Sequence, residues 1–375
     1  MTQQRTYLDY NASAPLRPAA RAAMLAAHDA FGNPSSVHTE GRRVHAIIET
    51  AREQVAGLIG AKPSEIVFTS GATEANNCAI DASWKTICVS AIEHDSVLAP
   101  ARACGAKIIT LPATPDGRVD LSAVKAALAE ASNDGRTLLS VMMANNETGV
   151  IQPLAEAAEL AREFNISLHV DAVQGPGRVP LNFATLGADT LTISAHKLGG
   201  PRGVGALVIR DGLSLPALIK GGGQERRRRG GTENVAGIAG FGAAAAEVAN
   251  EAAEAARITA LRETLEAGVM AATPDAVIIG RTAPRIGNTT CIAIAGKPSE
   301  TLVIRMDLDG VAISSGAACT SGKIGANTVL AAMGLGSDIT ASAVRVSLGY
   351  RTTVDDIAAF LAAWQKAAGG TALAA

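Results

Sequence analysis

The chain contains the stretch Leu191-Thr-Ile-Ser-Ala-His-Lys-Leu-Gly-Gly-Pro201, in which an apolar, strand-like run leads into a sharp turn. Glycine and proline are the residues that such turns favour. A lysine at this position, Lys197, can act as an imine-forming nucleophile if its amine is partly desolvated and neutral. The alternative is a surface lysine in a glycine-rich loop, which is the usual interpretation of a lone lysine.

A second apolar run, Ile166-Ser-Leu-His-Val-Asp171, ends on a carboxylate. If both runs are strands of one sheet, their ends direct Asp171 and Lys197 into the same pocket. A carboxylate opposite a pyridinium nitrogen keeps that ring protonated, and a protonated ring is an electron sink. The pair therefore indicates a pyridoxal phosphate site. Taken alone, Asp171 is more consistent with a strand-end aspartate that caps the next turn.

Short apolar segments alternate with helical periodicity between about residues 45 and 210. This alternation predicts an α/β fold with a large, mostly parallel sheet that helices cover on both faces. Ligands of such sheets lie beyond the carboxyl ends of the strands. The seven predicted strands are Glu65–Thr69, Thr86–Ser90, Lys107–Leu111, Leu138–Met142, Ile166–Val170, Thr190–Ile193 and Val204–Ile209.

The second part of the chain predicts a smaller α+β domain. An alanine-rich stretch from Phe241 to about Gly268 indicates one long connecting helix, with Glu247 and Glu251 among the charges of a solvated face. We expect a large domain over residues 14–250 and a small domain made of residues 1–13 and 251–375. Two domains suit 375 residues, because single cores usually stop growing at about 250–300 residues. The small domain should contain strands near 276–279 and 289–294, a helix over 299–308 and a final helix from 353.

Composition and charge exclude several classes of protein. Hydrophobic residues make up 48% of the chain and charged residues 18%, which is typical of a globular protein. A formal net charge of −2 gives no overall attraction to nucleic acid or to a membrane, although Arg226–Arg229 suggests a loop near anions. We expect a cytoplasmic protein, since no signal peptide and no apolar stretch of about 18 residues is evident. Five cysteines without a C-x-x-C pair argue against structural zinc and disulfides.

Polar motifs follow several of the predicted strands. Ser70-Gly-Ala-Thr-Glu74 opens a helical run, so its backbone N–H groups could hold a phosphate, or Ser70 or Thr73 could simply cap the helix. Ser194 and His196 would add phosphate donors. His94 could stack on a flat cofactor and shuttle protons, and the turn Asn145–Gly149 offers a side-chain amide. Each of these signals is weak when it is considered alone.

Cys319 differs from the other cysteines, because it lies in a run of small residues, Ser314–Gly322. The other four have the apolar contexts of buried, inert thiols. A thiol on a mobile loop could reach a substrate and withdraw, although a harmless loop cysteine is also consistent. Arg345 could bind a substrate carboxylate with its two-pronged guanidinium, or form a salt bridge inside the small domain.

In their order along the chain, these strings resemble the class V aminotransferase superfamily, and more narrowly the cysteine desulfurases of the NifS and IscS type. The match runs nearly end to end, from Tyr7–Pro15 and Gly32–His38 to Ser315–Ser321 and Arg345–Gly349. The resemblance implies the fold type I of pyridoxal phosphate-dependent transferases. It also implies a homodimer whose active site takes residues from both subunits.

The resemblance implies a role for each candidate residue. Lys197 would bind the cofactor aldehyde, Asp171 would pair with the pyridine nitrogen, and His94 would stack on the ring and take part in catalysis. Arg345, together with Asn146, would bind the substrate. Gln174 and Asn146 would reach the ring oxygen. The phosphate would be held by Ala72, Thr73, Ser194, His196 and, from the other subunit, Thr232.

The implied reaction converts L-cysteine to L-alanine, with attack of the Cys319 thiolate on the substrate sulfur. The resulting persulfide would pass its sulfur to an acceptor such as an iron–sulfur scaffold protein. One departure concerns that transfer, because Lys323–Asn327 stands where such proteins usually carry a Leu-Glu-Pro-Ser-like segment. The alternatives are a selenocysteine lyase or another class V aminotransferase, which would not depend on Cys319, and a non-catalytic sulfur-relay protein.

Overall fold

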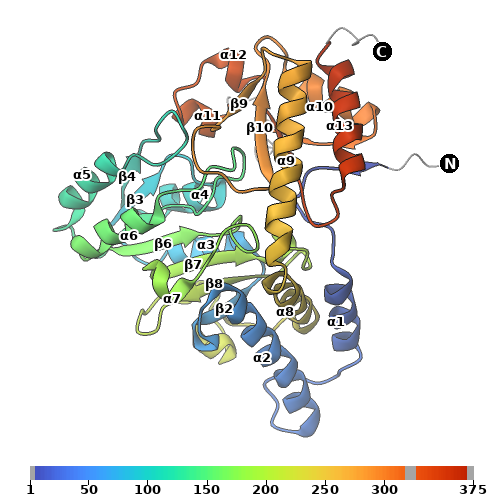
Figure 1. The fold of residues 1–375 in the computed structure, drawn as a ribbon. Helices are drawn as coiled ribbons and strands as arrows, with labels where there is room; N and C mark the ends of the chain where they lie inside the picture. Colours follow the sequence, from blue (N-terminus) through green and yellow to red (C-terminus); the bar gives the residue numbers. More distant parts are fainter. Residues whose placement is uncertain (1–4, 317–326, 370–375) are drawn as a thin grey trace.

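The computed structural model describes residues 5–316 and 327–369. Figure 1 shows a larger part, which contains α1 to α8, below a smaller part, which contains α9 to α13. Cys319 and Lys323 lie outside the described residues.

The larger part is built on a seven-stranded sheet with the order β2-β8-β7-β6-β5-β3-β4. The five strands from β7 to β4 in this order are parallel, whereas β8 is antiparallel to both of its neighbours. All seven predicted strands are therefore confirmed, as is the mostly parallel sheet. Their bounds are β2 (Ile66–Thr69), β3 (Thr86–Ser90), β4 (Lys107–Leu111), β5 (Thr137–Ser140), β6 (Ser167–Asp171), β7 (Thr190–Ser194) and β8 (Gly205–Ile209).

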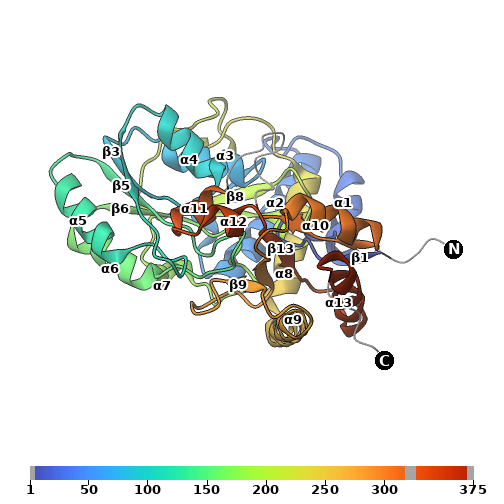
Figure 2. The same ribbon diagram turned by 90° about the horizontal axis from the view of Figure 1, so that it is seen from above.

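Helices cover both faces of this sheet, as Figure 2 shows from above. On one face, Ile80, Val97 and Ile87 form a core between the sheet and the helices α3 (Ala72–Ile80) and α4 (Asp95–Ala103). The main core lies on the other face. It is closed by α2 (Thr39–Ile59), α5 (Leu121–Ala131), α6 (Leu154–Glu163), α7 (Phe183–Leu186) and α8 (Val235–Ala249), and α1 (Pro18–His28) packs against α8.

The smaller part contains an antiparallel sheet with the order β12-β13-β10-β9 and a short parallel pair, β1 with β11. Its predicted strands and helices are confirmed, but β1, β11, β12 and β13 were not predicted. The strands are β1 (Thr6–Tyr7), β9 (Val277–Ile279), β10 (Thr289–Ala293), β11 (Val311–Ala312), β12 (Ser314–Ser315) and β13 (Val344–Ser347). The helices are α9 (Ala252–Ala272), α10 (Ser299–Leu308), α11 (Thr328–Ala332), α12 (Ser337–Thr340) and α13 (Val354–Ala367).

The prediction of one connecting helix from Phe241 to about Gly268 is wrong. The chain ends α8 at Ala249, and Glu251 has non-helical angles (φ −103°, ψ 44°) before α9 begins. The buried Arg17 explains this joint, because its guanidinium lies 2.8 Å from Oε1 of Glu247 and 2.8 Å from Oε2 of Glu251. These glutamates therefore bind a buried arginine instead of belonging to a solvated face. This tertiary contact overrides the helix propensity of the alanine-rich sequence.

The buried apolar side chains of the two parts form separate clusters. Ile48 and Phe241 belong to the main cluster of the larger part, whereas Phe360 and Trp364 belong to that of the smaller part. The segment from Leu8 to α1 connects the two clusters, because Leu8 belongs to the cluster of the smaller part while α1 packs on α8 in the larger part. The domain bounds at residues 13 and 250 stay a prediction.

Candidate active site

A cavity of about 580 Å³ lies at the carboxyl ends of the sheet strands, as expected for a sheet of this type. Its volume is within the usual range for a site that binds a small molecule. The predicted site residues that line it are Ala72, Thr73, His94, Asn146, Asp171, Gln174, Ser194, His196, Lys197 and Arg345.

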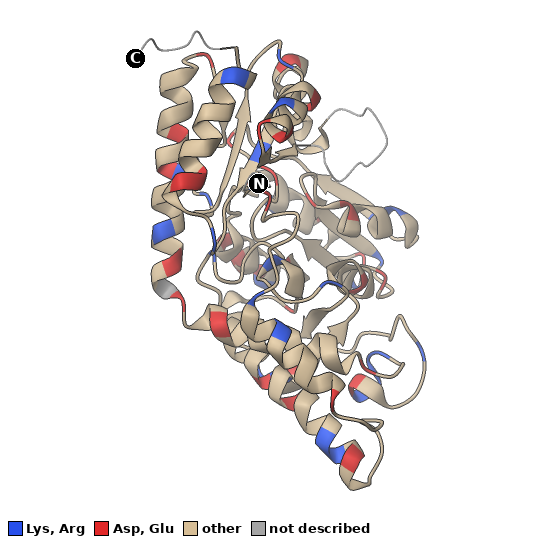
Figure 3. Cartoon of the chain, turned by 90° about the vertical axis from the view of Figure 1, so that its right-hand side faces the viewer, with Lys and Arg blue, Asp and Glu red and all other residues tan. Residues whose placement is uncertain are grey.

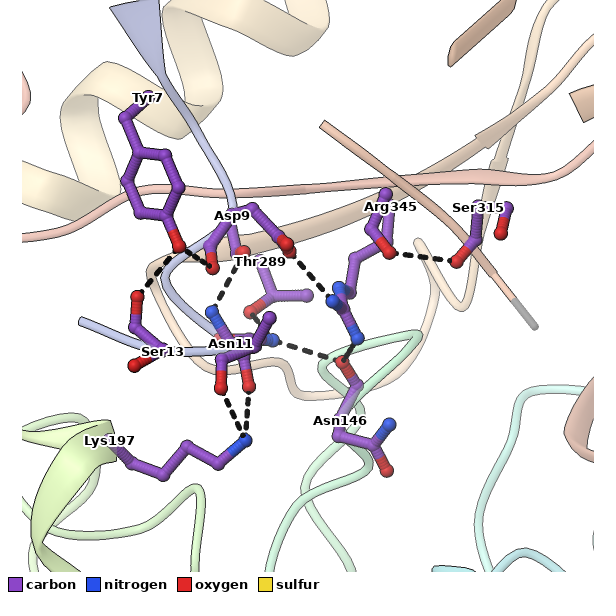
Figure 4. Close-up of polar contacts among 12 residues, drawn as sticks. Tyr7, Asp9, Asn11, Ser13, Asn146, Lys197, Thr289, Ser315 and Arg345 are labelled. Atoms are coloured by element: carbon purple, nitrogen blue, oxygen red, sulfur yellow. Dashed lines mark hydrogen bonds and ion pairs between the residues drawn. The ribbon is translucent and has the colours of Figure 1, made fainter. Parts of the chain in front are cut away.

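Lys197 reaches the cavity from a single turn of 3-10 helix, Ala195–Lys197, that directly follows β7. Its Nζ donates to the backbone carbonyls of Asn11 (2.5 Å) and Ala12 (3.1 Å), as Figure 4 shows. The sharp turn after it needs small residues, because a Cβ on Gly200 would lie 2.9 Å from Cβ of Ala195. Lys197 is therefore a half-buried cavity residue, not a lysine of an exposed loop.

Asp171 is the last residue of β6 and is 5% exposed. Its Oδ2 accepts a hydrogen bond from Nδ2 of Asn76 (2.8 Å), and its Oδ1 accepts one from the backbone N–H of Val173 (3.0 Å). The contact with Val173 is the turn cap that the alternative interpretation expected. A carboxylate has about four acceptor positions. Asp171 therefore retains acceptor capacity toward the cavity that it lines.

The strand β2 leads into α3 through Gly71, whose φ of +153° and ψ of 176° belong to a region that is essentially restricted to glycine. No side chain caps the start of α3, so the alternative in which Ser70 or Thr73 caps the helix is not observed. The N–H groups of a first helical turn have no partner within the helix, and the helix dipole favours an anion there. Ala72 and Thr73 line the cavity at this position, which suits a phosphate.

The two histidines of the cavity are held by neighbouring serines. His94 is the residue before α4, and its Nδ1 accepts a hydrogen bond from the backbone N–H of Ser96 (3.0 Å). Nδ1 of His196 lies 3.4 Å from Oγ of Ser13. Burial, with smaller contributions from the cations Lys197 and Arg202, lowers the pKa of His196 to about 4. The His196 ring is therefore neutral near pH 7.

Arg345 lies on β13 and is buried, yet its guanidinium forms part of the cavity wall. Its Nη2 donates to Oδ1 of Asp9 (2.7 Å), and its Nη1 donates to the carbonyl of Asn146 (3.3 Å) (Figure 4). Its Nε has no hydrogen-bond partner among the described residues. The salt bridge and the cavity position that the sequence offered as alternatives are thus both present.

Two further residues were not singled out from the sequence: Asn11 in the cavity wall, and Arg178, which contacts wall residues from behind. Nδ2 of Asn11 donates to Oγ1 of Thr289 (2.8 Å) and to the carbonyl of Asn146 (3.0 Å), and its Oδ1 accepts from Nη1 of Arg178 (2.9 Å). Arg178 also donates to Gln174 and to the carbonyl of Lys197. Burial, with Arg345 nearby, lowers the pKa of Arg178 to about 10. The only sequence signal for Asn11 was its place in the string Tyr7–Pro15.

Two predicted site residues are not brought into the cavity by the described structure. Cys319 lies outside the described residues. Thr232 is exposed, and it lines a separate hollow beside Ser70 and Arg229 of its own chain. The assignment of Thr232 to the phosphate site of a second subunit stays a prediction.

The arginine run forms an ordered loop. Glu225, Arg226 and Arg227 have positive φ values, and the buried Glu225 carboxylate lies 2.8 Å from the guanidinium of Arg52. Nε of Arg229 lies 2.9 Å from Oε1 of Glu74, which is another residue of the cavity wall. Figure 3 shows acidic and basic residues interspersed along the helices.

Three of the other four cysteines have the properties expected of buried, inert thiols. Burial raises the pKa of Cys78 to about 11 and that of Cys88 to about 12, and it raises the pKa of Cys291 further. Cys104 is half-buried.

Within residues 5–316 and 327–369, no group of three or more His, Cys, Asp or Glu side chains is arranged to hold a metal ion. No helix in the described part of the chain combines the length and the apolar character needed to cross a membrane.

Comparisons with known proteins agree with this geometry. Residues 6–360 match the family model described as Aminotransferase class-V. The chain is 41% identical over 367 residues to the cysteine desulfurase IscS of Dictyoglomus turgidum (strain DSM 6724 / Z-1310), covering 95% of this chain and 92% of that protein.

Two solved structures extend the comparison. The NifS-like protein from Rickettsia africae ESF-5 has a TM-score of 0.91 and 36% identity, covering 98% of this chain and all of that one. The structure of SspA in complex with cysteine has a TM-score of 0.80 and 30% identity, covering 92% and 98%. The expected fold type I architecture is thereby confirmed. This chain belongs to the class V aminotransferase family and, within it, to the cysteine desulfurases of the NifS and IscS type.

Proposed function

We propose that this chain converts L-cysteine to L-alanine and passes the sulfur on through a persulfide on Cys319. The observation that carries the proposal is the meeting of Lys197, Asp171 and the uncapped start of α3 in one cavity. Pyridoxal 5'-phosphate, when bound there, supplies the electron sink that this conversion needs.

The described residues fit that cofactor at three positions. Asp171 has acceptor capacity for a ring N–H, and the α3 N-terminus, with Ser194 and His196 nearby, provides donors for a phosphate. The Lys197 amine lies in the same cavity, where two backbone carbonyls hold it. A volume of about 580 Å³ also leaves room for an amino-acid substrate.

Arg345 is the residue that we assign to the substrate carboxylate. Its guanidinium lines the cavity and is fixed by Asp9 and by the carbonyl of Asn146, whose side chain we assign to the substrate and the ring oxygen together with that of Gln174. A fixed, planar guanidinium binds a carboxylate with defined orientation. His94 lines the same cavity, and we assign proton transfer and ring stacking to it.

The proposed role of Cys319 requires its segment to begin and end beside the cavity. The described residues on either side of that segment are Gly316 and Asn327, and a Cβ on Gly316 would lie 2.7 Å from Nδ2 of Asn327. That Nδ2 donates to Oε2 of Glu147 (2.5 Å), the residue after Asn146. Both ends are thus attached beside the cavity. In the proposed step the Cys319 thiolate forms a bond to the substrate sulfur as the carbon–sulfur bond breaks, and the carbon is then protonated to give L-alanine.

We further propose that the enzyme acts as a cytoplasmic homodimer. Thr232 of each subunit would complete the phosphate site of the other, since it lies outside the cavity of its own chain. The persulfide sulfur would pass to an acceptor such as an iron–sulfur scaffold protein. We expect this last transfer to be affected by Lys323–Asn327, the stretch that differs from the Leu-Glu-Pro-Ser-like segment usual in such proteins.

The test uses purified protein loaded with pyridoxal phosphate. We expect a visible absorbance band that shifts when L-cysteine is added, and equal amounts of L-alanine and released sulfide when a thiol reductant is present. Cys319→Ala should keep the absorbance and lose the persulfide and the sulfide release, whereas the control Cys104→Ala should keep all of them. Sulfide release by Cys319→Ala at the rate of the unaltered enzyme would contradict the proposal.

A further inference from the structure

Asn76 connects Asp171 to the buried His169 and, through His169, to Thr190, two residues that none of the assigned roles uses. We infer that Asn76 is the positioning residue for Asp171, because its amide, oriented by His169, presents a fixed N–H donor to one carboxylate oxygen and so keeps that carboxylate in place. The inference rests on the proposed function, since it concerns how Asp171 meets the cofactor ring.

Every polar atom of the Asn76 side chain has a buried partner. Asn76 lies on α3 and has no exposed surface. Its Nδ2 donates to Oδ2 of Asp171 (2.8 Å) and to Oγ of Ser96 (2.8 Å), and its Oδ1 lies 3.1 Å from Nε2 of His169. One amide thus joins α3 to the end of β6, to the middle of β6 and to α4.

The partners determine which way the amide faces. A carboxylate only accepts hydrogen bonds, so the NH2 group of Asn76 must face Asp171. Its oxygen then faces Nε2 of His169 and can only accept, so His169 carries its proton on Nε2. Nδ1 of His169 must then accept, and its partner is the hydroxyl of Thr190 at 2.9 Å. Burial lowers the pKa of His169 to about 3, so the ring is neutral and holds one proton.

A second buried carboxyl shows why Asp171 needs this donor. Glu93 is buried, and its pKa is raised well above the ordinary value by burial and by the nearby Asp171. Its Oε1 accepts from the backbone N–H of Met142 (2.5 Å), while its Oε2 has no partner within the described part of the chain. Asp171 instead receives donors on both oxygens. The donor from Asn76 therefore gives Asp171 a hydrogen bond on the oxygen that has no counterpart at Oε2 of Glu93.

The filling of space alone does not explain an asparagine at this position. A leucine has a similar size, but it would leave Oδ2 of Asp171, Nε2 of His169 and Oγ of Ser96 without the partner that Asn76 gives them. The adjacent Asn77 offers a matched comparison, because it lies on the same helix and its Nδ2 donates to the carbonyl of Thr73 (2.7 Å). Asn77→Ala removes a similar amide and leaves the hydrogen bonds of Asn76 intact.

The first measurement is made on the unaltered protein without cofactor. Imidazole nitrogen chemical shifts, with histidine labelled by nitrogen-15, should show a neutral His169 with its proton on Nε2 throughout the neutral pH range. A proton on Nδ1 would require the reverse amide orientation and would overturn the inference. This measurement does not depend on any variant folding.

The second measurement compares the Asn76→Leu and Asn77→Ala enzymes after loading with pyridoxal phosphate labelled at its ring nitrogen. Asn76→Leu should lower the fraction of protonated ring nitrogen and raise the dissociation constant of the cofactor by roughly tenfold or more, the effect of losing a hydrogen bond to a charged group. Asn77→Ala should change neither quantity. A folded Asn76→Leu protein with an unchanged ring-nitrogen signal would overturn the inference.

These readouts are separate from those of the proposed function, because neither measurement contains substrate. A protein that shows both expected signals but forms no L-alanine from L-cysteine would refute the proposed function alone. A protein that forms L-alanine while Asn76→Leu behaves like Asn77→Ala would refute the positioning role alone.

Discussion

Nζ of Lys197 lies 2.5 Å from the carbonyl oxygen of Asn11, a residue 186 positions earlier in the chain. Residues 11–13 therefore form part of the cavity wall, and the carbonyls of Asn11 and Ala12 hold the lysine amine there. The Asn11 side chain is in turn held by Asn146, Thr289 and Arg178, so the wall belongs to a continuous network of hydrogen bonds.

Asn11→Ala tests this network. The substitution removes the side-chain bonds to Thr289 and to the carbonyl of Asn146 and leaves buried partners unsatisfied, so we expect a loss of roughly 2–3 kcal/mol in the free energy of unfolding. Cofactor retention should weaken in parallel. Denaturant unfolding and cofactor titration measure the two effects. Asn33→Ala is the control, because Asn33 is exposed and its side chain accepts a hydrogen bond from the nearby backbone N–H of Ser35. Equal stability of the two variants would refute the prediction.

Arg345→Lys should raise KM for L-cysteine by about 10- to 100-fold, because a lysine cannot reproduce the planar, two-pronged contact with a carboxylate. The absorbance of the bound cofactor should not change, since Arg345 is assigned to the substrate. Steady-state kinetics and spectra of the loaded enzyme check both statements. Arg281→Lys, at an exposed position of the smaller part, serves as the control. A KM like that of the control would contradict the assignment.

Gly71→Ala should destabilise the protein by roughly 1–3 kcal/mol, because φ at this position is +153° and a Cβ strains that conformation. Affinity for phosphate or pyridoxal phosphate should fall as well, since Gly71 sets the direction of the α3 N-terminus. Gly57→Ala is the matched comparison, because Gly57 lies exposed within α2 and a Cβ there meets nothing within 4 Å. It should stabilise the protein by about 0.5–1 kcal/mol. Thermal unfolding and cofactor titration distinguish the two glycines.

Glu147→Gln should change how stability depends on pH. Burial raises the pKa of Glu147 to about 7, so the folded state binds its proton more tightly than the unfolded state does. The resulting stabilisation is complete below the ordinary pKa of 4.5 and is lost as the pH rises through 7. Each tenfold change in proton affinity is worth about 1.4 kcal/mol. The free energy of unfolding of the unaltered protein should therefore fall by up to about 3 kcal/mol as the pH rises above 7, whereas that of the variant should not change with this proton.

Denaturant unfolding at several pH values between 4 and 8 measures this difference. Glu53→Gln, at an exposed position of α2, is the control and should follow the unaltered protein. Parallel stability curves for Glu147→Gln and the unaltered protein would rule out a tightly bound proton on Glu147.

The sequence predicted the large sheet well, because its strands are apolar runs of about five residues between helical segments. It did not predict β13, in which the polar Arg345 and Ser347 alternate with Val344 and Val346. It also missed the joint after α8, since local helix propensity carries no information about the ion pairs of a distant Arg17. In both cases tertiary contacts decided the structure.

The site could be predicted where residue type and position at a strand end coincide, as for Lys197 and Asp171. Asn76 and Asn11 could not be predicted in this way, because their importance arises from partners 95 and 186 positions away. An asparagine within a helix or near a chain end has no local pattern that separates it from an ordinary surface residue.

The pairing of β1 with β11 has a consequence for biosynthesis. Asp9, just after β1, meets Arg345, which a ribosome adds 336 residues later. Translation therefore adds Arg345, a residue of the cavity wall, long after the Asp9 that holds it, although domains generally begin to fold during synthesis. A nascent chain cannot complete this pocket until Arg345 has left the exit tunnel, so we expect the pocket to bind a ligand only after that point. Removal of Tyr7 to Asn11 would take away both the Asp9 carboxylate that holds Arg345 and the Asn11 carbonyl that holds Lys197.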